Sequence, residues 1–441
     1  MKEYALEIAT KARAVLPKLS SLNPGVKNSI LIRVSQLLKE NKELIQKENE
    51  KDIEFARSIN LSKAMIDRLK VGEKQINSMI KVLEDVAKLK DPVGEITSMW
   101  TVDNGLKIGR MRVPLGVIFI IYESRPNVTI EAASLCFKSS NAVILRGGKE
   151  AIHTNKILSD LFRQAIKEHV EGLEDAVCFV DKREREIVTE LLQLEGLVDV
   201  AIPRGGESLI KAVSETAKIP VIKHYKGVCS IYVDNEADLK KAYDIVYNAK
   251  VQRPSVCNAI ENLVIHKDLL QDFWPKMAMV LLESDVELRC DEDSYEILQN
   301  KDFEAFKSKI KKATEKDYYE EFLDLILAVK TVNSLEEAMQ FIEKYGSKHS
   351  DAIITENHTK AMRFLQEVDS AAVYVNASTR FTDGNEFGLG AEMGISTDKI
   401  HARGPMALRE LTIEKFIIFG NGQLRENVGI PKELKQKLQI D

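Results

Sequence analysis

The chain has 441 residues, of which 44% are hydrophobic and 30% are charged, and its formal net charge is -5. This length predicts two or three compact units of ordinary globular composition. The small, mixed charge excludes a broad nucleic-acid or membrane surface, and the longest apolar run, residues 113–122, is too short to cross a bilayer. Five scattered cysteines and seven histidines show no disulfide framework and no metal-ligand spacing, so we expect a cytoplasmic protein without a metal.

Residues 1–90 are predicted to be helical, because apolar side chains recur there at steps of three and four residues. Asp103-Asn104-Gly105 then separates two alternating segments, a pattern typical of a hairpin. Between residues 116 and 218, short apolar strands alternate with amphipathic helices. This alternation predicts a parallel sheet covered on both faces, with ligands at the carboxyl ends of its strands.

A second alternating series begins at residue 228, after a boundary expected at Ile219-Pro220, and closes with residues 371–376. Within it, residues 303–316 are predicted to be helical. The late apolar segment, residues 411–419, is expected to be a strand that pairs with the early hairpin. The predicted fold class is therefore α/β.

Cys257 follows a loop that contains Arg253-Pro254 and precedes an apolar strand. A nucleophile at such a junction is held rigidly and remains reachable. The alternative is a buried cysteine that acts as a small apolar residue, and this is the more frequent role of a free cysteine. The presence of other functional motifs in the same chain decides between these two roles.

Two predicted strand ends carry glycine pairs that favour a nucleotide. Glycines let a backbone approach a ligand closely, and free amides at a helix start attract anions. Neither pair matches GxGxxG, so ordinary strand-to-helix turns explain each pair equally well. The residues concerned are Arg146, Gly147, Gly148 and Lys149 at the first turn, and Arg204, Gly205, Gly206 and Ser208 at the second.

The cations Arg146 and Lys149 bear on the choice of cofactor. An acidic residue usually binds the ribose of NAD, whereas cations accommodate the 2′-phosphate of NADP, so the pair favours NADPH unless both are simply solvated. Asn127, after the first predicted strand, could donate a hydrogen bond to an oxyanion. Its alternative role is to cap the helix that follows.

These motifs, taken in order, resemble those of the gamma-glutamyl phosphate reductases, the reductive proline-biosynthesis branch of the aldehyde dehydrogenase superfamily. The resemblance covers nearly the whole chain and rests on motifs that aldehyde dehydrogenases at large do not share. The residues that carry it are 122–127, 145–151, 203–208, 255–262, 321–325, 375–384 and 387–396.

The resemblance implies an aldehyde dehydrogenase-like fold with three parts. It implies a Rossmann-like NADP-binding domain (residues 1–95 and 115–225), an α/β catalytic domain (residues 226–395) and a small β oligomerisation arm (residues 96–114 and 396–430). In this scheme Cys257 is the nucleophile and Asn127 lies in the oxyanion hole. Arg146 and Lys149 lie near the adenosine ribose, and Glu321 holds the nicotinamide ribose.

One departure from the superfamily is informative. Hydrolytic members carry a glutamate in an ELGGK motif that activates water, but the corresponding residues 222–227 contain no carboxylate. Without a general base, water competes poorly for an acyl-enzyme, so phosphate can be the partner in acyl exchange. His224 could replace the missing base.

The resemblance implies NADPH-dependent reduction of L-glutamyl 5-phosphate to L-glutamate 5-semialdehyde through a cysteine thioester. Arg125 and Arg253 are expected near the thiol or the substrate phosphate, while Asn376, Arg380 and Asp383 are expected at the amino-acid end. The alternatives are a CoA-acylating or other semialdehyde dehydrogenase, and a non-catalytic nucleotide-binding partner of glutamate 5-kinase. We expect a homodimer or homotetramer, with transient contact to that kinase as a further partner.

Overall fold

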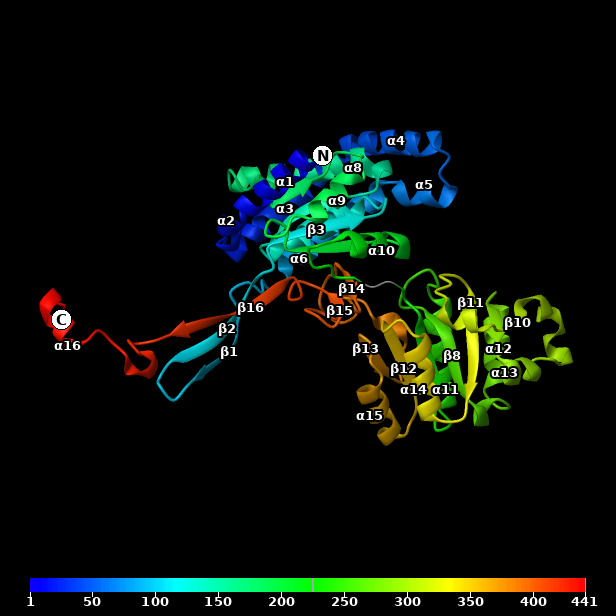
Figure 1. Ribbon diagram of the computed structural model, residues 1–441. Helices are drawn as coiled ribbons and strands as arrows, with labels where there is room; N and C mark the ends of the chain where they lie inside the picture. The colour runs from blue at the N-terminus through cyan, green and yellow to red at the C-terminus, as the bar shows by residue number, and fades with distance from the viewer. Residues whose placement is uncertain (224–225, 441) are drawn as a thin grey trace.

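The computed structural model describes residues 1–223 and 226–440. Two parallel sheets form separate bodies, and a small three-stranded sheet projects away from the first body (Figure 1). The predicted α/β fold class is confirmed. Among the described residues, no helix combines the length and the apolar character that crossing a bilayer requires.

Six helices precede the first strand, and five of them share one hydrophobic core with the first sheet. The fifth helix packs instead through Leu69 against Ala56 and Ala151. In the first helix, Ala5, Ala9 and Ala12 are fully buried because they recur on one face. Asn23 starts the third helix, where its side chain accepts the Gly25 N–H at 2.8 Å. The helices are α1 (Lys2–Ala14), α2 (Leu16–Ser20), α3 (Pro24–Glu40), α4 (Lys42–Ser58), α5 (Lys63–Leu69) and α6 (Glu73–Lys88).

The first sheet has four parallel strands in the order β5-β4-β3-β6. Every residue of β3 is buried, as expected for a strand covered on both faces. The strand order reverses between β3 and β6, so their carboxyl ends face a switch-point crevice. The elements are β3 (Val117–Tyr122), α7 (Asn127–Lys138), β4 (Ala142–Arg146), α8 (Ile152–His169), β5 (Val177–Phe179), α9 (Glu186–Leu192), β6 (Val200–Arg204) and α10 (Glu207–Thr216).

The second sheet has seven parallel strands in the order β10-β9-β11-β8-β7-β12-β13. Its strand order reverses between β7 and β12. The strands are β7 (Cys229–Val233), β8 (Ile260–His266), β9 (Glu287–Cys290), β10 (Ile310–Lys312), β11 (Ile326–Val332), β12 (Ser350–Ile354) and β13 (Ala372–Val375). The helices are α11 (Leu239–Val251), α12 (Trp274–Glu283), α13 (Glu292–Ile297), α14 (Leu335–Tyr345) and α15 (His358–Glu367).

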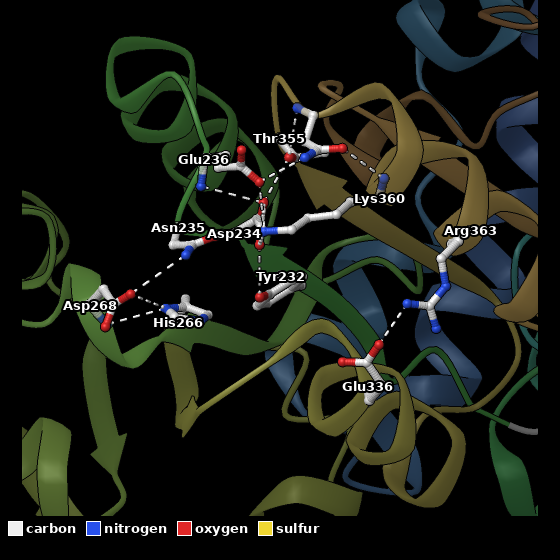
Figure 2. A network of polar contacts seen from close by, with 11 residues as sticks. Tyr232, Asp234, Asn235, Glu236, His266, Asp268, Glu336, Thr355, Lys360 and Arg363 are labelled. Atoms are coloured by element: carbon white, nitrogen blue, oxygen red, sulfur yellow. Dashed lines mark hydrogen bonds and ion pairs between the residues drawn. The ribbon is translucent and has the colours of Figure 1, made fainter.

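A polar network fills the carboxyl end of the second sheet, where β7 meets β12 (Figure 2). The buried carboxylate of Asp234 accepts hydrogen bonds from Tyr232 (3.1 Å), Thr355 (2.8 Å) and Lys360 (2.9 Å). A buried carboxylate is stable when it is paired and hydrogen-bonded in this way. The switch point of the second sheet is therefore occupied by the side chains of the protein itself.

The projecting arm confirms the predicted pairing of the early hairpin with the late strand. β1 (Ile96–Thr101) and β2 (Lys107–Pro114) are antiparallel, and β2 also pairs with β16 (Thr412–Phe419). Gly105 allows the tight turn because it adopts a positive φ of 84°. Beyond the arm, the chain ends in α16 (Lys432–Leu438), which buries none of its residues.

Three segments differ from the sequence predictions. Residues 303–316 are not one helix but contain β10, an edge strand paired with β9. The expected boundary at Ile219-Pro220 still belongs to the first sheet, since the Ala201 N–H donates to the Pro220 carbonyl at 2.9 Å. Residues 394–406 form their own strand pair, β14 (Gly394–Ser396) and β15 (Gly404–Met406), rather than part of the arm. Met393 and Met406 bind this pair to the first core.

Candidate active site

Cys257 lies in the loop between α11 and β8 and keeps part of its surface exposed, whereas the other four cysteines are buried. Two contacts fix its backbone. The Cys229 thiol donates to the Cys257 carbonyl oxygen at 3.1 Å, and a Cβ at Gly227 would lie 2.1 Å from the same oxygen. The loop is therefore held in place, and Cys257 as a whole residue keeps some exposed surface, which favours a nucleophile over a fully buried apolar residue.

The surroundings of the Cys257 thiol disfavour its ionisation. Burial raises its pKa to about 12, and the carboxylates of Glu321 and Glu392 raise it further, while the guanidinium of Arg204 opposes them. A raised pKa favours the neutral thiol over the thiolate, which is the nucleophilic form of a cysteine.

Arg204 ends β6, and its positive charge lowers the pKa of the Cys257 thiol. A Cβ at Gly394 would lie 2.1 Å from the Arg204 guanidinium, so the start of β14 packs against that side chain. The positive charge of Arg204 lowers the pKa of both Cys257 and Glu392. The first sheet thus contributes a cation to the thiol of the second body.

Asn127 is the first residue of α7, and Pro126 occupies the N-cap, so the expectation that Asn127 caps this helix is wrong. Its side-chain amide donates to Glu131 at 2.8 Å. The negative charge of Glu131 raises the pKa of Glu392, and the negative charge of Glu392 raises the pKa of Cys257. The amide is therefore linked to the thiol only through the charges of Glu131 and Glu392.

Arginines from both bodies converge near the thiol. Burial lowers the pKa of Arg125, which still presents exposed surface, and the like charges of Arg204 and Arg253 lower it further. Burial also lowers the pKa of Arg380, again with Arg253 as a like charge beside it. The Arg380 Nε donates to Gln252 at 2.9 Å, which orients it. Like charges gathered in this way create a positive potential that favours an anionic ligand.

Of the three residues expected at the amino-acid end of the substrate, the loop after β13 brings two together and leaves the third apart. Arg380 and Asp383 lie near each other, and Asp383 accepts the N–H groups of Asn385 (2.8 Å) and Glu386 (3.3 Å). The structure does not bring Asn376 to them. Its side chain is bonded to Thr355, at the carboxyl end of β12, whereas Cys257 precedes the amino end of β8.

A cavity of about 720 Å³ opens at the carboxyl ends of β3 and β4. This volume lies within the range of small-molecule sites. Four of the predicted cofactor residues line it, together with three arginines that the sequence analysis did not single out. The four predicted residues are Arg146, Gly148, Lys149 and Ser208, and the three additional residues are Arg68, Arg183 and Arg185.

The cations of this cavity are arranged to receive an anion. Arg146 donates to the carbonyl oxygens of Gly147 (2.8 Å) and Arg183 (3.3 Å), so the backbone holds its guanidinium. Burial lowers the pKa of Arg146, and the like charge of Arg185 contributes. Within residues 1–223 and 226–440, the side chains of Arg185 and Lys149 make no hydrogen bond or ion pair. This donor set fits the phosphates of a nicotinamide nucleotide.

The second glycine turn already holds a carboxylate of this chain. The Gly206 N–H donates to Glu123 at 2.7 Å, and a Cβ at Gly205 would lie 2.7 Å from the Glu123 side chain. Gly147 and Gly148 are also closely packed, with Cβ positions 2.2 Å and 2.1 Å from the nearest side-chain atoms. Internal packing by itself therefore accounts for these glycines.

Glu321 lies in the irregular segment before β11. The Gly227 N–H donates to its carboxylate and lowers its pKa, but burial raises that pKa and prevails. Since Gly227 also lies against the backbone of Cys257, the structure places Glu321 beside the thiol.

Four charged residues of the site escaped the sequence analysis: Glu392, Arg68, Arg183 and Arg185. Glu392 lies inside one of the quoted motifs, but nothing in its local pattern separates it from a solvated carboxylate. Arg183 and Arg185 belong to the charged run before α9, where alternating charge resembles a solvated helix start. His224, suggested as a replacement base, lies outside the described residues.

Two parallel α/β sheets, the first with a basic cavity at its carboxyl end and the second preceded by a partly exposed cysteine, are the arrangement of an oxidoreductase of the aldehyde dehydrogenase type. Residues 2–319 match the model of the aldehyde dehydrogenase family. A gamma-glutamyl phosphate reductase of a Hydrogenobaculum species is 98% identical over 441 residues, with 100% of each chain covered. One from Aquifex aeolicus is 67% identical, with 98% of each chain covered.

A solved structure supports the same assignment. The crystal structure of gamma-glutamyl phosphate reductase from Thermotoga maritima has a TM-score of 0.92 and 44% identity, covering 96% of this chain and 99% of that chain. The chain belongs to the aldehyde dehydrogenase family and, within it, to the gamma-glutamyl phosphate reductases. It is therefore an oxidoreductase of a family that uses a nicotinamide cofactor.

Proposed function

We propose that this chain reduces L-glutamyl 5-phosphate to L-glutamate 5-semialdehyde with NADPH, through a thioester on Cys257, as a step of proline biosynthesis. The observation that carries the proposal is Cys257, a partly exposed residue that interacts electrostatically with Arg204 of the first body and Arg380 of the second. The names of the relatives at 98% and 67% identity support the choice of substrate.

In the first step, Cys257 reacts as a thiolate with the acyl carbon of the substrate. The bond from Sγ to that carbon forms, and the bond from the carbon to the phosphate oxygen breaks. The Asn127 amide and the Cys257 N–H are the donors for the tetrahedral oxyanion. One such donor is worth about 3 kcal/mol of barrier. Arg125 and Arg253 hold the phosphate that leaves.

A nicotinamide cofactor, held by the cations of the cavity, would supply the hydride that reduces the thioester. The side chain of Glu321, fixed by the Gly227 N–H, orients the ribose beside the thiol. As the semialdehyde forms, the bond between carbon and Sγ breaks, and its electron pair returns to Cys257 as thiolate. The positive charge of Arg204 stabilises that thiolate.

The absence of a carboxylate in residues 222–227 favours phosphate over water as the acyl acceptor in the reverse reaction. The amino-acid end of the substrate lies at the loop after β13, with Arg380 for its carboxylate and Asp383 for its ammonium group. Of the carboxylates in this loop, Glu392 rather than Asp383 is among the main charges that raise the pKa of the thiol.

The preference for NADPH over NADH rests on the cations of the cavity. Arg146 is held by backbone oxygens, which leaves the unpaired side chains of Arg185 and Lys149 to bind a 2′-phosphate. Replacement of Arg185 by Gln should weaken 2′,5′-ADP binding by about tenfold and leave 5′-AMP binding unchanged, as measured by calorimetry. Equal losses for the two nucleotides would contradict this role.

The arm supports a homo-oligomer, either dimer or tetramer. Trp100, Phe416, Ile418 and Phe419 of its strands expose between 40% and 58% of their surface. Exposed apolar side chains gathered on one sheet mark a contact with another chain. A second copy of this chain is the partner that we propose.

One assay tests the reaction against its rivals. With glutamate 5-semialdehyde as substrate, reduction of NADP should require inorganic phosphate, and arsenate should replace phosphate. Coenzyme A in place of phosphate should give no turnover. Turnover with coenzyme A alone would identify a CoA-acylating enzyme, and turnover without any acceptor would identify a hydrolytic dehydrogenase.

A further inference from the structure

A buried ion pair closes the loop that carries Cys257. Lys250, in the last turn of α11, and Glu261, near the start of β8, have fully buried side chains, and their Nζ and Oε2 atoms are 2.6 Å apart. The Lys250 Nζ also donates to the Ile260 carbonyl at 2.9 Å. One side chain before the loop and one after it therefore hold its two ends together.

The same pair holds the segment that carries Glu321. The Leu323 N–H donates to the second carboxylate oxygen of Glu261 at 3.1 Å. Leu323 has a φ of 53°, a left-handed conformation that costs a branched residue free energy and persists only when its surroundings impose it. Its hydrogen bond to Glu261 is such a constraint, and Leu323 lies two residues after Glu321.

Stability is a poor explanation for this pair. Taking both charges out of water costs free energy, and burial raises the pKa of Glu261 to about 7 even with Lys250 beside it. Well-packed apolar residues in place of a buried pair are often equally stabilising. An apolar residue in place of Glu261 could accept no hydrogen bond. The two carboxylate oxygens of Glu261 accept hydrogen bonds from different partners, Lys250 and Leu323.

We propose that Lys250 and Glu261 are positioning residues that set the separation between the Cys257 thiol and the Glu321 carboxylate. Neither touches the substrate, and the proposal rests on the proposed function, in which Glu321 holds the cofactor ribose while Cys257 carries the acyl group. Gly227 completes the arrangement, because its N–H binds Glu321 and its backbone lies against Cys257.

Two substitutions distinguish the two roles of the pair, which are to hold the loop of Cys257 and to hold the segment of Glu321. Glu261→Leu removes the acceptor for both Lys250 and Leu323, so kcat should fall by about 100-fold, the scale of a displacement of roughly 1 Å, and NADPH should bind several-fold more weakly. Lys250→Met leaves the Leu323 contact intact. It should lower kcat by about tenfold and change the rate of Cys257 alkylation, with NADPH affinity unchanged.

Glu261→Gln is the conservative variant, because its amide oxygen still accepts the Leu323 N–H, and it should restore NADPH affinity. The matched control is Lys27→Met. Lys27 and Asp91 form another buried pair, 2.7 Å apart, which joins α3 to the segment after α6 away from the thiol. This control should lower the thermal midpoint and leave kcat and NADPH affinity unchanged.

The measurements are kcat and KM in the phosphate-dependent assay, NADPH affinity by fluorescence titration, and Cys257 alkylation. If the Glu261 and Lys250 variants lose thermal stability like the control but keep kcat and NADPH affinity within about twofold, the positioning role is refuted. Failure of the proposed function is distinguishable, since wild-type protein would then show no phosphate-dependent turnover. The binding and alkylation comparisons would still test the positioning. If Glu261→Leu does not fold, Lys250→Met and Glu261→Gln decide the question.

Discussion

The two parallel sheets of this chain use opposite ends. The first sheet leaves a cavity of about 720 Å³ at the carboxyl ends of β3 and β4, lined by cations. The second sheet closes its carboxyl end with the network around Asp234 (Figure 2) and presents Cys257 before the amino end of β8. Carboxyl ends of parallel strands commonly bind ligands. In this chain that tendency locates the basic cavity and not Cys257.

Loss of the thiol tests this division most strongly. Cys257→Ala should abolish acyl-phosphate reduction, because no other cysteine is exposed. NADPH affinity should stay within about twofold, because the cavity belongs to the other sheet. The two measurements are the phosphate-dependent assay and a fluorescence titration. Residual turnover of the alanine variant would refute the thioester.

The next largest effect concerns a side chain of the first body. Asn127→Ala should lower kcat by about 100- to 1,000-fold, since it removes one donor to the oxyanion. The KM for NADP should remain unchanged. Asn127→Asp, which keeps the size but adds a negative charge, should be no better than alanine. A change confined to KM would assign the amide to binding instead.

The thiol should titrate at an unusually high pH in the free protein. Because the pKa of Cys257 is raised to about 12, its alkylation rate should rise about tenfold per pH unit from pH 7 to pH 10 without a plateau. Glu392→Gln removes one of the carboxylates that raise this pKa, so alkylation at pH 8 should become several-fold faster. A plateau below pH 9 in the wild-type protein would contradict this environment.

The raised pKa also has a consequence for stability. The folded state holds the Cys257 proton more tightly than the unfolded state, whose thiol has an ordinary pKa of about 8.5. The stabilisation of the folded state by this tighter proton binding is therefore complete below about pH 8.5 and is lost as the pH rises toward 12. Cys257→Ala should remove this part of the alkaline loss of stability, as measured by urea denaturation between pH 8 and pH 10.

The smallest effect on activity is expected at the closed end of the second sheet. Lys360→Met leaves the buried Asp234 carboxylate without its cation and should cost about 2 kcal/mol in the free energy of unfolding. The value of kcat should stay within about twofold, because the network lies at the carboxyl end of the sheet, opposite Cys257. Urea denaturation and the phosphate-dependent assay are the two measurements. A large loss of kcat at full stability would show that this end of the sheet is functional.

The sequence by itself determined the α/β class, the hairpin arm and the identity of the motifs. These depend on local patterns: apolar runs between helices, an Asp-Asn-Gly turn, and glycines at strand ends. Its errors also have local causes. Residues 303–316 look helical by polar periodicity, but β10 forms because β9 offers an edge to pair with.

Only the tertiary structure decided which side chains face the thiol. The charge of Arg204 acts on the pKa of Cys257, the Glu123 carboxylate accepts the Gly206 N–H, and Asn376 is hydrogen-bonded to Thr355 at the far end of the sheet. The directions of these side chains depend on partners more than 20 residues away in sequence. Local patterns contain no information on such partners, because charge and hydrogen bonding act through space rather than along the chain.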